Sequence, residues 1–339
     1  MTRTRVFFGA GAVRHLPGAL DHLGLERAFL VTTTGRAAEA DRVAEALGPR
    51  LAGRHDGAVP HVPVASVDAA LAALDAAAPD VIVAVGGGTA IGLAKALALR
   101  TGLPIAAAPT TYSGSEMTSI WGLTEGGVKR TGRDPRVAAS IVVYDAELTR
   151  SLPPDLSAAS GMNAMAHAVE ALYAADADEA TRDRAEDAAR QLAASLPLVV
   201  ERPDDLAARE AALRGAWLAA VALNEASMGL HHRLCHVLGG RFGLPHAMTH
   251  AVLLPHVVAF NAPAAPDAMR RLAVALGVAD APEGLAALNR RLGIAARLRD
   301  LGLTRDDLDN AAAAAADDRY PNPRPASVDD VRQILNAAF

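Results

Sequence analysis

The first half of the chain alternates short β-branched runs with alanine-rich stretches of helical period. This alternation is typical of a parallel sheet covered by helices, because buried parallel strands read as continuous apolar runs. Two further pieces, 120–123 and 128–131, flank Gly126 and Gly127 and predict a hairpin. The predicted strands are 27–33, 81–85, 104–108 and 141–144, and the predicted helices are 37–47, 67–77 and 90–100.

After Pro153 the apolar period changes from two residues to about 3.6, which indicates helices. The pair Pro153 and Pro154 marks a boundary, because two prolines disfavour continuing a helix or a strand. We therefore predict an α/β domain with a Rossmann-like parallel sheet over 1–153 and an all-α domain over 154–339. The predicted helices of the second domain are 156–174, 180–196, 206–223 and 246–260, and the alanine run 311–316 is also compatible with a helix.

Composition and charge exclude several classes of protein. The 38 acidic and 33 basic residues leave a formal charge of −5, which gives no reason to expect nucleic acid as a partner. Cys235 is the single cysteine, so no intrachain disulfide can form. The N-terminus lacks the apolar stretch of a secretory signal, and the stretch 81–94 is broken by four glycines and too short to span a bilayer. We expect a cytoplasmic protein with a small-molecule ligand and no membrane partner.

A triple glycine follows the predicted strand 81–85 and leads into a helix that carries Lys95. Glycines allow the backbone to approach a phosphate closely, and a helix N-terminus offers unpaired N–H groups to a diphosphate. The spacing differs from the usual dinucleotide fingerprint, and a tight turn without a ligand is the alternative interpretation. The predicted cofactor-binding residues of this segment are Gly86, Gly87, Gly88, Thr89 and Lys95.

A second loop, 110–116, is rich in hydroxyl groups and follows the next predicted strand. Parallel sheets bind their ligands at the carboxyl ends of the strands, so two neighbouring loops of this kind favour a phosphate site. The same loop would also fit a helix cap, with Ser113 at the cap and Glu116 three residues later. The predicted cofactor-binding residues here are Thr110, Thr111, Ser113 and Ser115.

Histidines are concentrated in the second domain, where six of eleven lie between positions 231 and 256. Two pairs are spaced so that each can face one way from a helix: His232 with His236, and His246 with His250. Earlier in the chain, Asn163, His167 and Glu170 form a polar stripe on a helix that is otherwise apolar. Three interpretations remain open for these residues: a structural cluster, a metal site, or a metal-free catalytic pocket.

In their order and spacing, these motifs resemble the iron-containing alcohol dehydrogenase family over nearly the whole chain. The resemblance rests on the segments 86–89, 110–116 and 161–170, and on His232, His236 and His246. Within that family, the segments 115–125 and 229–240 are similar to the maleylacetate reductases. The resemblance implies the dehydroquinate synthase-like fold of this family and a homodimer.

The resemblance also implies which residues would bind a metal ion. Metal-dependent members have an aspartate at the position of Asn163 and histidines at those of His167, His232 and His246. Because an asparagine brings no negative charge, we expect no tightly bound metal. If an ion does bind, we expect His167, His232 and His246 to hold it.

The cofactor implied by the resemblance is NADH or NADPH. NAD-selective members have an acid after the strand that ends near position 31, whereas this chain has Thr33 between two other threonines. Arg36 follows, and a nearby arginine can accommodate a 2′-phosphate, so the sequence predicts the use of both cofactors. The family also has an aspartate at the position of Gly92, which changes the expected contacts to the ribose.

The activity implied by the resemblance is NAD(P)H-dependent reduction of the conjugated C=C bond of maleylacetate to 3-oxoadipate, in the breakdown of aromatic compounds. Hydride addition there gives a delocalised enolate, which needs less stabilisation than the alkoxide of an alcohol dehydrogenase. The predicted catalytic residues are Asn163, His167, His232, His236 and His246. The predicted partners of the two substrate carboxylates are His231, Arg233 and Arg241, with Lys129 and Arg130 as further candidates.

Two alternative functions remain. One is a metal-dependent alcohol or polyol dehydrogenase that uses the three histidines as ligands. The other is a dehydroquinate synthase-like lyase, which uses its nicotinamide only transiently and consumes no NADH.

Overall fold

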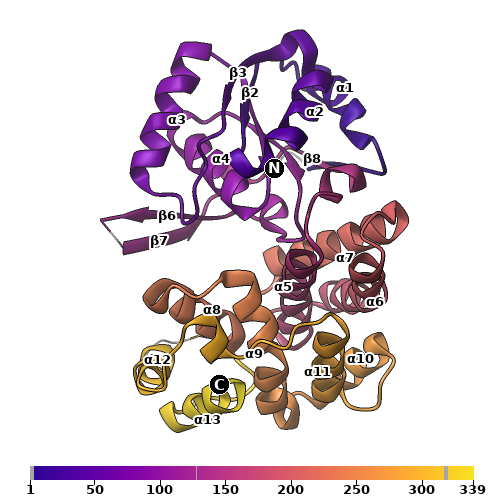
Figure 1. Ribbon diagram of the computed structural model, residues 1–339, viewed down its shortest axis with the longest axis vertical. Coiled ribbons are helices and arrows are strands. Elements are labelled where there is room, and N and C mark those ends of the chain that lie inside the picture. Colours follow the sequence, from indigo (N-terminus) through magenta and orange to yellow (C-terminus); the bar gives the residue numbers. More distant parts are fainter. Residues whose placement is uncertain (1–3, 127, 317–319) are drawn as a thin grey trace. The chain divides into compact units, whose positions relative to one another are not determined.

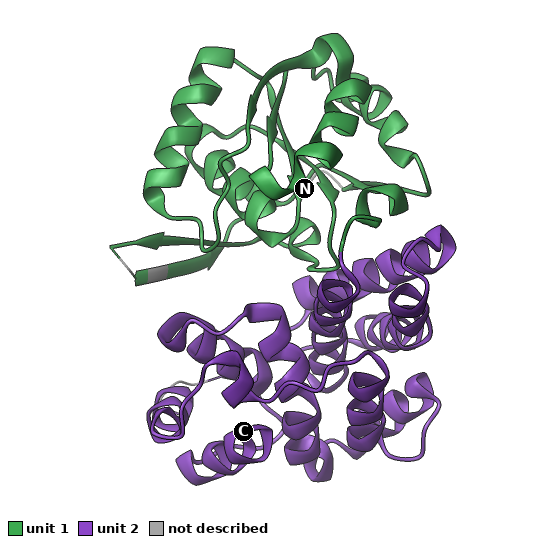
Figure 2. Ribbon diagram, viewed as in Figure 1, with its two compact units in different colours: residues 1–152 green, residues 153–339 purple. Residues whose placement is uncertain are grey.

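The computed structural model describes residues 4–126, 128–316 and 320–339. It divides into two compact units, residues 1–152 and residues 153–339 (Figure 2). The first unit is an α/β structure, and the described part of the second is helical (Figure 1). The predicted fold class is therefore confirmed.

Six parallel strands form the main sheet of the first unit, in the order β1-β8-β5-β4-β2-β3. The strands β2, β4, β5 and β8 are buried along their whole length, because helices cover both faces of the sheet (Figure 1). The strands are β1 (Arg5–Phe8), β2 (Ala28–Val31), β3 (Leu51–His55), β4 (Val81–Gly86), β5 (Ile105–Pro109) and β8 (Ile141–Tyr144). The helices are α1 (Leu16–Asp21), α2 (Ala37–Leu47), α3 (Val64–Ala77) and α4 (Gly88–Thr101).

The predicted hairpin forms a separate two-stranded antiparallel sheet of β6 (Ile120–Glu125) and β7 (Val128–Arg133). Its strands are longer than predicted, because Gly132 leaves room for the Trp121 ring on the neighbouring strand. A Cβ atom at Gly132 would lie 2.8 Å from that ring. Gly127, part of the predicted turn, lies outside the described residues.

In the second unit, α5 packs against α6, α7 and α9 and is buried over most of its length (Figure 1). Gly161 allows the close approach of α6, since a Cβ atom there would clash with the side chain of Leu196. Within the described residues, no helix is long and apolar enough to cross a membrane. The helices are α5 (Pro154–Tyr173), α6 (Glu179–Glu201), α7 (Leu206–Glu225), α8 (Leu230–Phe242), α9 (His246–Asn261), α10 (Pro266–Leu276), α11 (Ala281–Arg291), α12 (Asp307–Ala316) and α13 (Val328–Ala338).

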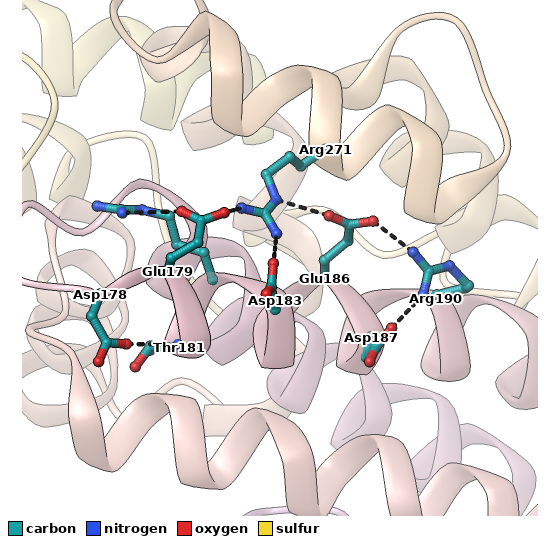
Figure 3. Close-up of polar contacts among 9 residues, drawn as sticks. Asp178, Glu179, Thr181, Asp183, Glu186, Asp187, Arg190 and Arg271 are labelled. Atoms are coloured by element: carbon teal, nitrogen blue, oxygen red, sulfur yellow. Dashed lines mark hydrogen bonds and ion pairs between the residues drawn. The ribbon is translucent and has the colours of Figure 1, made fainter.

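An ion-pair network joins α10 to α6 (Figure 3). Arg271 on α10 bonds to Glu179 at 2.5 Å, to Glu186 at 2.8 Å and also to Asp183. Glu186 is shared with Arg190. A single arginine thus holds three acids on one face of α6, which fixes the packing of these two helices.

Candidate active site

The triple glycine forms a tight connection between β4 and α4. Gly86 has a φ of 148°, a conformation that side chains other than glycine rarely adopt. Gly87 caps α4 without a side-chain hydrogen bond, and a Cβ atom there would lie 2.9 Å from the side chain of Thr111. Because Gly87 and Gly88 carry no side chain of their own, the backbone N–H groups at the N-terminus of α4, which continues into Thr89, are suited to a diphosphate.

Hydroxyl groups line the neighbouring strand ends. Among the described residues, four buried serine and threonine hydroxyl oxygens lack a hydrogen-bond partner, and all four follow β2 or β5. Buried polar atoms are normally paired, so an unpaired set at a sheet edge fits a ligand with many polar groups, such as a dinucleotide. Thr33 and Ser115 lie half-buried in the same two loops. The four residues are Thr32, Thr110, Thr111 and Ser113.

The side chain of Lys95, predicted as a cofactor ligand, makes its hydrogen bonds within the fold. Its Nζ donates to the backbone carbonyls of Ser115, Thr118 and Ile120 at 2.7–2.8 Å, and to the hydroxyl of Thr118 at 3.0 Å. The side chain is 1% exposed, and burial lowers its pKa to about 7. The three N–H donors of Lys95 are therefore used within the fold, where they hold the loop that follows β5.

Glu116 lies inside the first unit and does not complete a helix cap. The short 3₁₀ helix Ser115–Met117 begins after Gly114 without a side-chain cap from Ser113. The carboxyl of Glu116 instead accepts a hydrogen bond from the hydroxyl of Tyr144 at 2.8 Å. Burial raises the pKa of Glu116, and nearby Lys95 partly offsets this.

Gly92 is explained by packing. A Cβ atom there would lie 3.0 Å from Cγ2 of Val62, so a side chain at this position would require that of Val62 to shift by a few tenths of an ångström.

In the second unit, four histidine rings lie around the ring of His250. The ring of His246 lies 4.5 Å from it, that of His232 4.8 Å, that of His231 4.9 Å and that of His167 6.3 Å. His236 completes the group, with its ring 6.2 Å from those of His232 and His246. The rings come from α5, α8 and α9, so residues predicted separately from three helices form one cluster.

The cluster runs from the surface of this unit into its interior. His236 and His246 are exposed, whereas His167 and His232 are buried, and His231 and His250 are fully buried. Burial, together with the neighbouring imidazoles, lowers the pKa of His167 and of His250 well below the usual value. These two rings are therefore neutral near pH 7 and can offer a lone pair.

Glu170 fixes the orientation of His232. Its Oε2 lies 2.5 Å from Nδ1 of His232, and its two oxygens also accept the backbone N–H groups of Gly229 and His231 at 3.1 and 2.9 Å. Burial alone would raise the pKa of Glu170, but the contact with His232 and these N–H groups brings it below the usual value. A carboxylate accepting from Nδ1 leaves Nε2 of His232 as the functional nitrogen, as in catalytic dyads and in histidines that bind metals.

Several buried polar atoms at and around this dyad lack hydrogen-bond partners within the described part of the chain. They include Nε2 of His232, Nδ1 of His167 and Oδ1 of Asn163. The rings of His167 and His232 are stacked 5.0 Å apart. Two imidazole nitrogens and one amide oxygen are chemically suited to a divalent ion, and equally to the oxygen atoms of a polar substrate.

A second group of possible metal ligands lies deeper. Nε2 of His231 is 2.9 Å from Nδ1 of His250 and 3.7 Å from Sγ of Cys235, and the three ligand atoms lie within 4.8 Å of one another. Burial lowers the pKa of His231 to about 3, so this ring is neutral. A neutral, fully buried ring is not a cationic partner for a substrate carboxylate, and the prediction of that role for His231 is corrected here.

The predicted arginines have different surroundings. Arg233 donates to the backbone carbonyl of Ala314 at 2.7 Å, so part of its guanidinium holds α12. Arg241 is exposed at the end of α8. Arg130 forms an exposed ion pair with Glu125 on the hairpin. The side chain of Lys129 lies outside the described part of the structure.

A groove of about 600 Å³ lies elsewhere in the second unit, among residues of α6, α10 and α11. Met269, Val274 and Pro282 line it, and it contains none of the predicted site residues. The groove therefore gives no support to a site at that place.

Two family models together match almost the entire chain. The model described as iron-containing alcohol dehydrogenase matches residues 3–146, and the model of the C-terminal part of the Fe-containing alcohol dehydrogenase family matches residues 157–339. The chain belongs to the iron-containing alcohol dehydrogenase family. Members of this family typically bind NAD(P), and often iron.

Individual members of the family are similar to the chain over its full length. Maleylacetate reductase 2 from Cupriavidus pinatubonensis is 52% identical, covering 99% of this chain and 94% of that protein. Maleylacetate reductase from Sphingobium indicum is 49% identical, covering 98% and 95%. The crystal structure of maleylacetate reductase from Agrobacterium tumefaciens is 44% identical with a TM-score of 0.96, covering 100% of this chain and 97% of that one.

Sequence reasoning identified Glu170 only as part of a polar stripe and missed its contact with His232. The two residues are 62 positions apart, and no local pattern connects them. The spacing of Asn163, His167 and Glu170 was the available signal, because it places all three on one face of α5.

Proposed function

We propose that this chain is an NAD(P)H-dependent oxidoreductase that reduces the conjugated C=C bond of maleylacetate to 3-oxoadipate, in the catabolism of aromatic compounds. The observation that carries the proposal is its similarity, over nearly the full length, to two maleylacetate reductases at 49% and 52% identity. The chemistry of the described residues supports it independently in each unit.

The first unit would bind the cofactor. Backbone N–H groups at Gly87, Gly88 and Thr89 would hold the diphosphate at the N-terminus of α4. Thr110, Thr111 and Ser113 bring hydroxyls to the next strand end, and Lys95 keeps their loop in place through its carbonyl contacts. When bound, NADH or NADPH supplies the hydride that adds to the carbon β to the ketone of maleylacetate.

The second unit would stabilise the enolate and deliver the proton. His232 is the strongest candidate for this role, because Glu170 accepts from Nδ1 and leaves Nε2 as the nitrogen available for proton transfer. That proton would go to the carbon α to the ketone, which completes the reduction of the double bond. The amide of Asn163 and the exposed rings of His236 and His246 offer further hydrogen bonds to the enolate oxygen.

A divalent ion, where one binds, would be held by His167, His232 and His246, and it would supply Lewis-acid polarisation of the ketone. We propose that reduction of the enone does not depend on it. Asn163 contributes no negative charge to offset that of the ion, and the enolate spreads its own charge over several atoms. The unpaired nitrogens of His167 and His232 favour a second candidate, a metal-dependent alcohol dehydrogenase.

One assay separates these functions. Purified enzyme is given NADH and maleylacetate, beside a panel of alcohols and aldehydes with the matching cofactor, and the absorbance of NADH is followed. Rapid, stoichiometric oxidation of NADH by maleylacetate alone is the expected result. Turnover only of alcohols or aldehydes supports the metal-dependent dehydrogenase, and conversion without net consumption of NADH supports the lyase.

A further inference from the structure

The segment after β2 contains an ion pair that the sequence did not reveal. Nη1 of Arg36 donates to Oε1 of Glu39 at 3.3 Å and to Oγ of Ser151 at 2.7 Å. Ser151 also donates to the same oxygen of Glu39. The side chain of Glu39 is 8% exposed and that of Arg36 is 18% exposed. Arg36, predicted from the sequence as a cation available to a cofactor, is thus already neutralised by Glu39.

This pair lies at the strand next to the glycine loop. The strand β2 is paired in parallel with β4, with Val31 opposite Ala84, and the glycine loop begins two residues later at Gly86. In doubly wound sheets, the diphosphate binds at such a glycine turn, and residues after the neighbouring strand contact the ribose that carries the 2′-hydroxyl or the 2′-phosphate. On the proposed function, Arg36 and Glu39 are therefore close to the group that distinguishes NADH from NADPH.

We propose that Glu39 is a specificity-determining residue, which favours NADH over NADPH by keeping Arg36 neutralised. This inference rests on the proposed use of a nicotinamide cofactor. A 2′-phosphate that recruits Arg36 leaves the buried carboxylate of Glu39 with only Ser151 as a partner, and an uncompensated buried charge is strongly disfavoured. A 2′-phosphate that does not recruit Arg36 is repelled by Glu39. The 2′-hydroxyl of NADH carries no charge, so it neither draws Arg36 away from Glu39 nor is repelled by Glu39.

The experiment measures dissociation constants of NADH and NADPH by isothermal titration calorimetry, so that it needs no substrate. The variants are Glu39→Gln, which removes the charge but keeps the shape, and Glu39→Gln combined with Arg36→Leu. Glu147→Gln is the matched control, because Glu147 forms an exposed pair with Arg42 in the same unit. Thermal unfolding verifies that each variant is folded.

Wild type is expected to bind NADH more tightly than NADPH. Glu39→Gln should tighten NADPH binding about tenfold, with NADH unchanged within about twofold, because Arg36 becomes available to the phosphate. The double variant should lose most of this gain and keep only the part that comes from removing the repulsion by Glu39, and the control should show none. Equal binding of both cofactors by wild type, an unchanged ratio in folded Glu39→Gln, or a gain that persists in full without Arg36 would each overturn the proposal.

If Glu39→Gln does not fold, the single variant Arg36→Leu tests the proposal instead. It leaves Glu39 uncompensated, so NADPH binding should weaken further while NADH binding holds, and unchanged NADPH binding would overturn the proposal. Failure of folded wild type to bind either dinucleotide would overturn this inference together with the cofactor of the proposed function. Binding of NADH without turnover of maleylacetate would overturn only the proposed substrate.

Discussion

Replacing Glu170 by glutamine tests whether His232 depends on its carboxylate partner. Glu170 is fully buried, and its two oxygens accept from His232 Nδ1 and from the backbone N–H groups of His231 and Gly229. Glutamine has almost the same shape but only one acceptor oxygen and no charge. If the amide NH₂ faces His232, Nδ1 must accept a hydrogen bond instead of donating one, so the tautomer of the ring is reversed.

The size of the effect follows from the hydrogen bond that is lost. A hydrogen bond to a charged group contributes about 1.5–3 kcal/mol, which at 1.36 kcal/mol per factor of ten predicts a decrease in kcat of about 10- to 150-fold. The KM for the cofactor should change little, because Glu170 belongs to the second unit and the glycine loop to the first. Steady-state kinetics with maleylacetate measures both quantities.

Tyr173→Phe is the control, because the Tyr173 hydroxyl contacts Glu170 only at 3.5 Å and the substitution removes no charge. A double variant with His232→Ala gives the decisive comparison. If Glu170 acts through His232, Glu170→Gln should lower kcat little further in a protein that already carries His232→Ala. The reasoning would be refuted by folded Glu170→Gln with kcat within threefold of wild type, or by a full further decrease in the double variant.

Three further predictions follow from other parts of the molecule. Activity on maleylacetate should survive dialysis against a chelator, because Asn163 brings no negative charge to a metal site. If dialysis abolishes turnover and one divalent ion restores it, this prediction is wrong, and His167, His232 and His246 are metal ligands. Gly87→Val should weaken NADH binding about tenfold or more while the protein stays folded, since its side chain would meet Thr111 at 2.9 Å, and calorimetry measures the affinity. The free energy of unfolding should fall between pH 7.5 and pH 5, because His231 stays neutral in the folded state with a pKa of about 3, whereas in the unfolded chain it takes up a proton near pH 6.5. The contribution of His231 to the free energy of unfolding is thus complete above pH 6.5 and decreases below it, by about 2 kcal/mol at pH 5. Denaturant titrations that give the same free energy of unfolding at pH 7.5 and pH 5 would contradict the assignment.

The fold was largely predictable where the apolar pattern is strong. The predicted helix 37–47 and strand 141–144 agree with α2 and β8 to the residue, because a regular pattern of buried positions defines both. The edge strands β1 and β3 were missed. Each is short and only half-buried, and β3 includes Arg54 and His55, so neither shows the continuous apolar run of a central strand.

The candidate site was predictable in its residue types but not in its pairings. Glycine and hydroxyl loops are local signals, so their positions at the strand ends could be inferred from the sequence. The role of Lys95 depends on partners 20 or more positions away, and that of Glu39 depends on the distant Ser151 as well as on the nearby Arg36. His231 was predicted beside the substrate, yet its side chain lies about 100° from that of His232 around α8 and contacts His250 in the interior.

The central claim is that hydride adds to the conjugated double bond and not to the ketone. The most direct measurement uses NADH that carries deuterium at the transferred position, followed by NMR of the product of maleylacetate reduction. The account predicts 3-oxoadipate with an intact ketone and one deuterium on the carbon that was β to it. Deuterium on a carbinol carbon, with the double bond retained, would contradict the account and identify the chain as a ketone reductase.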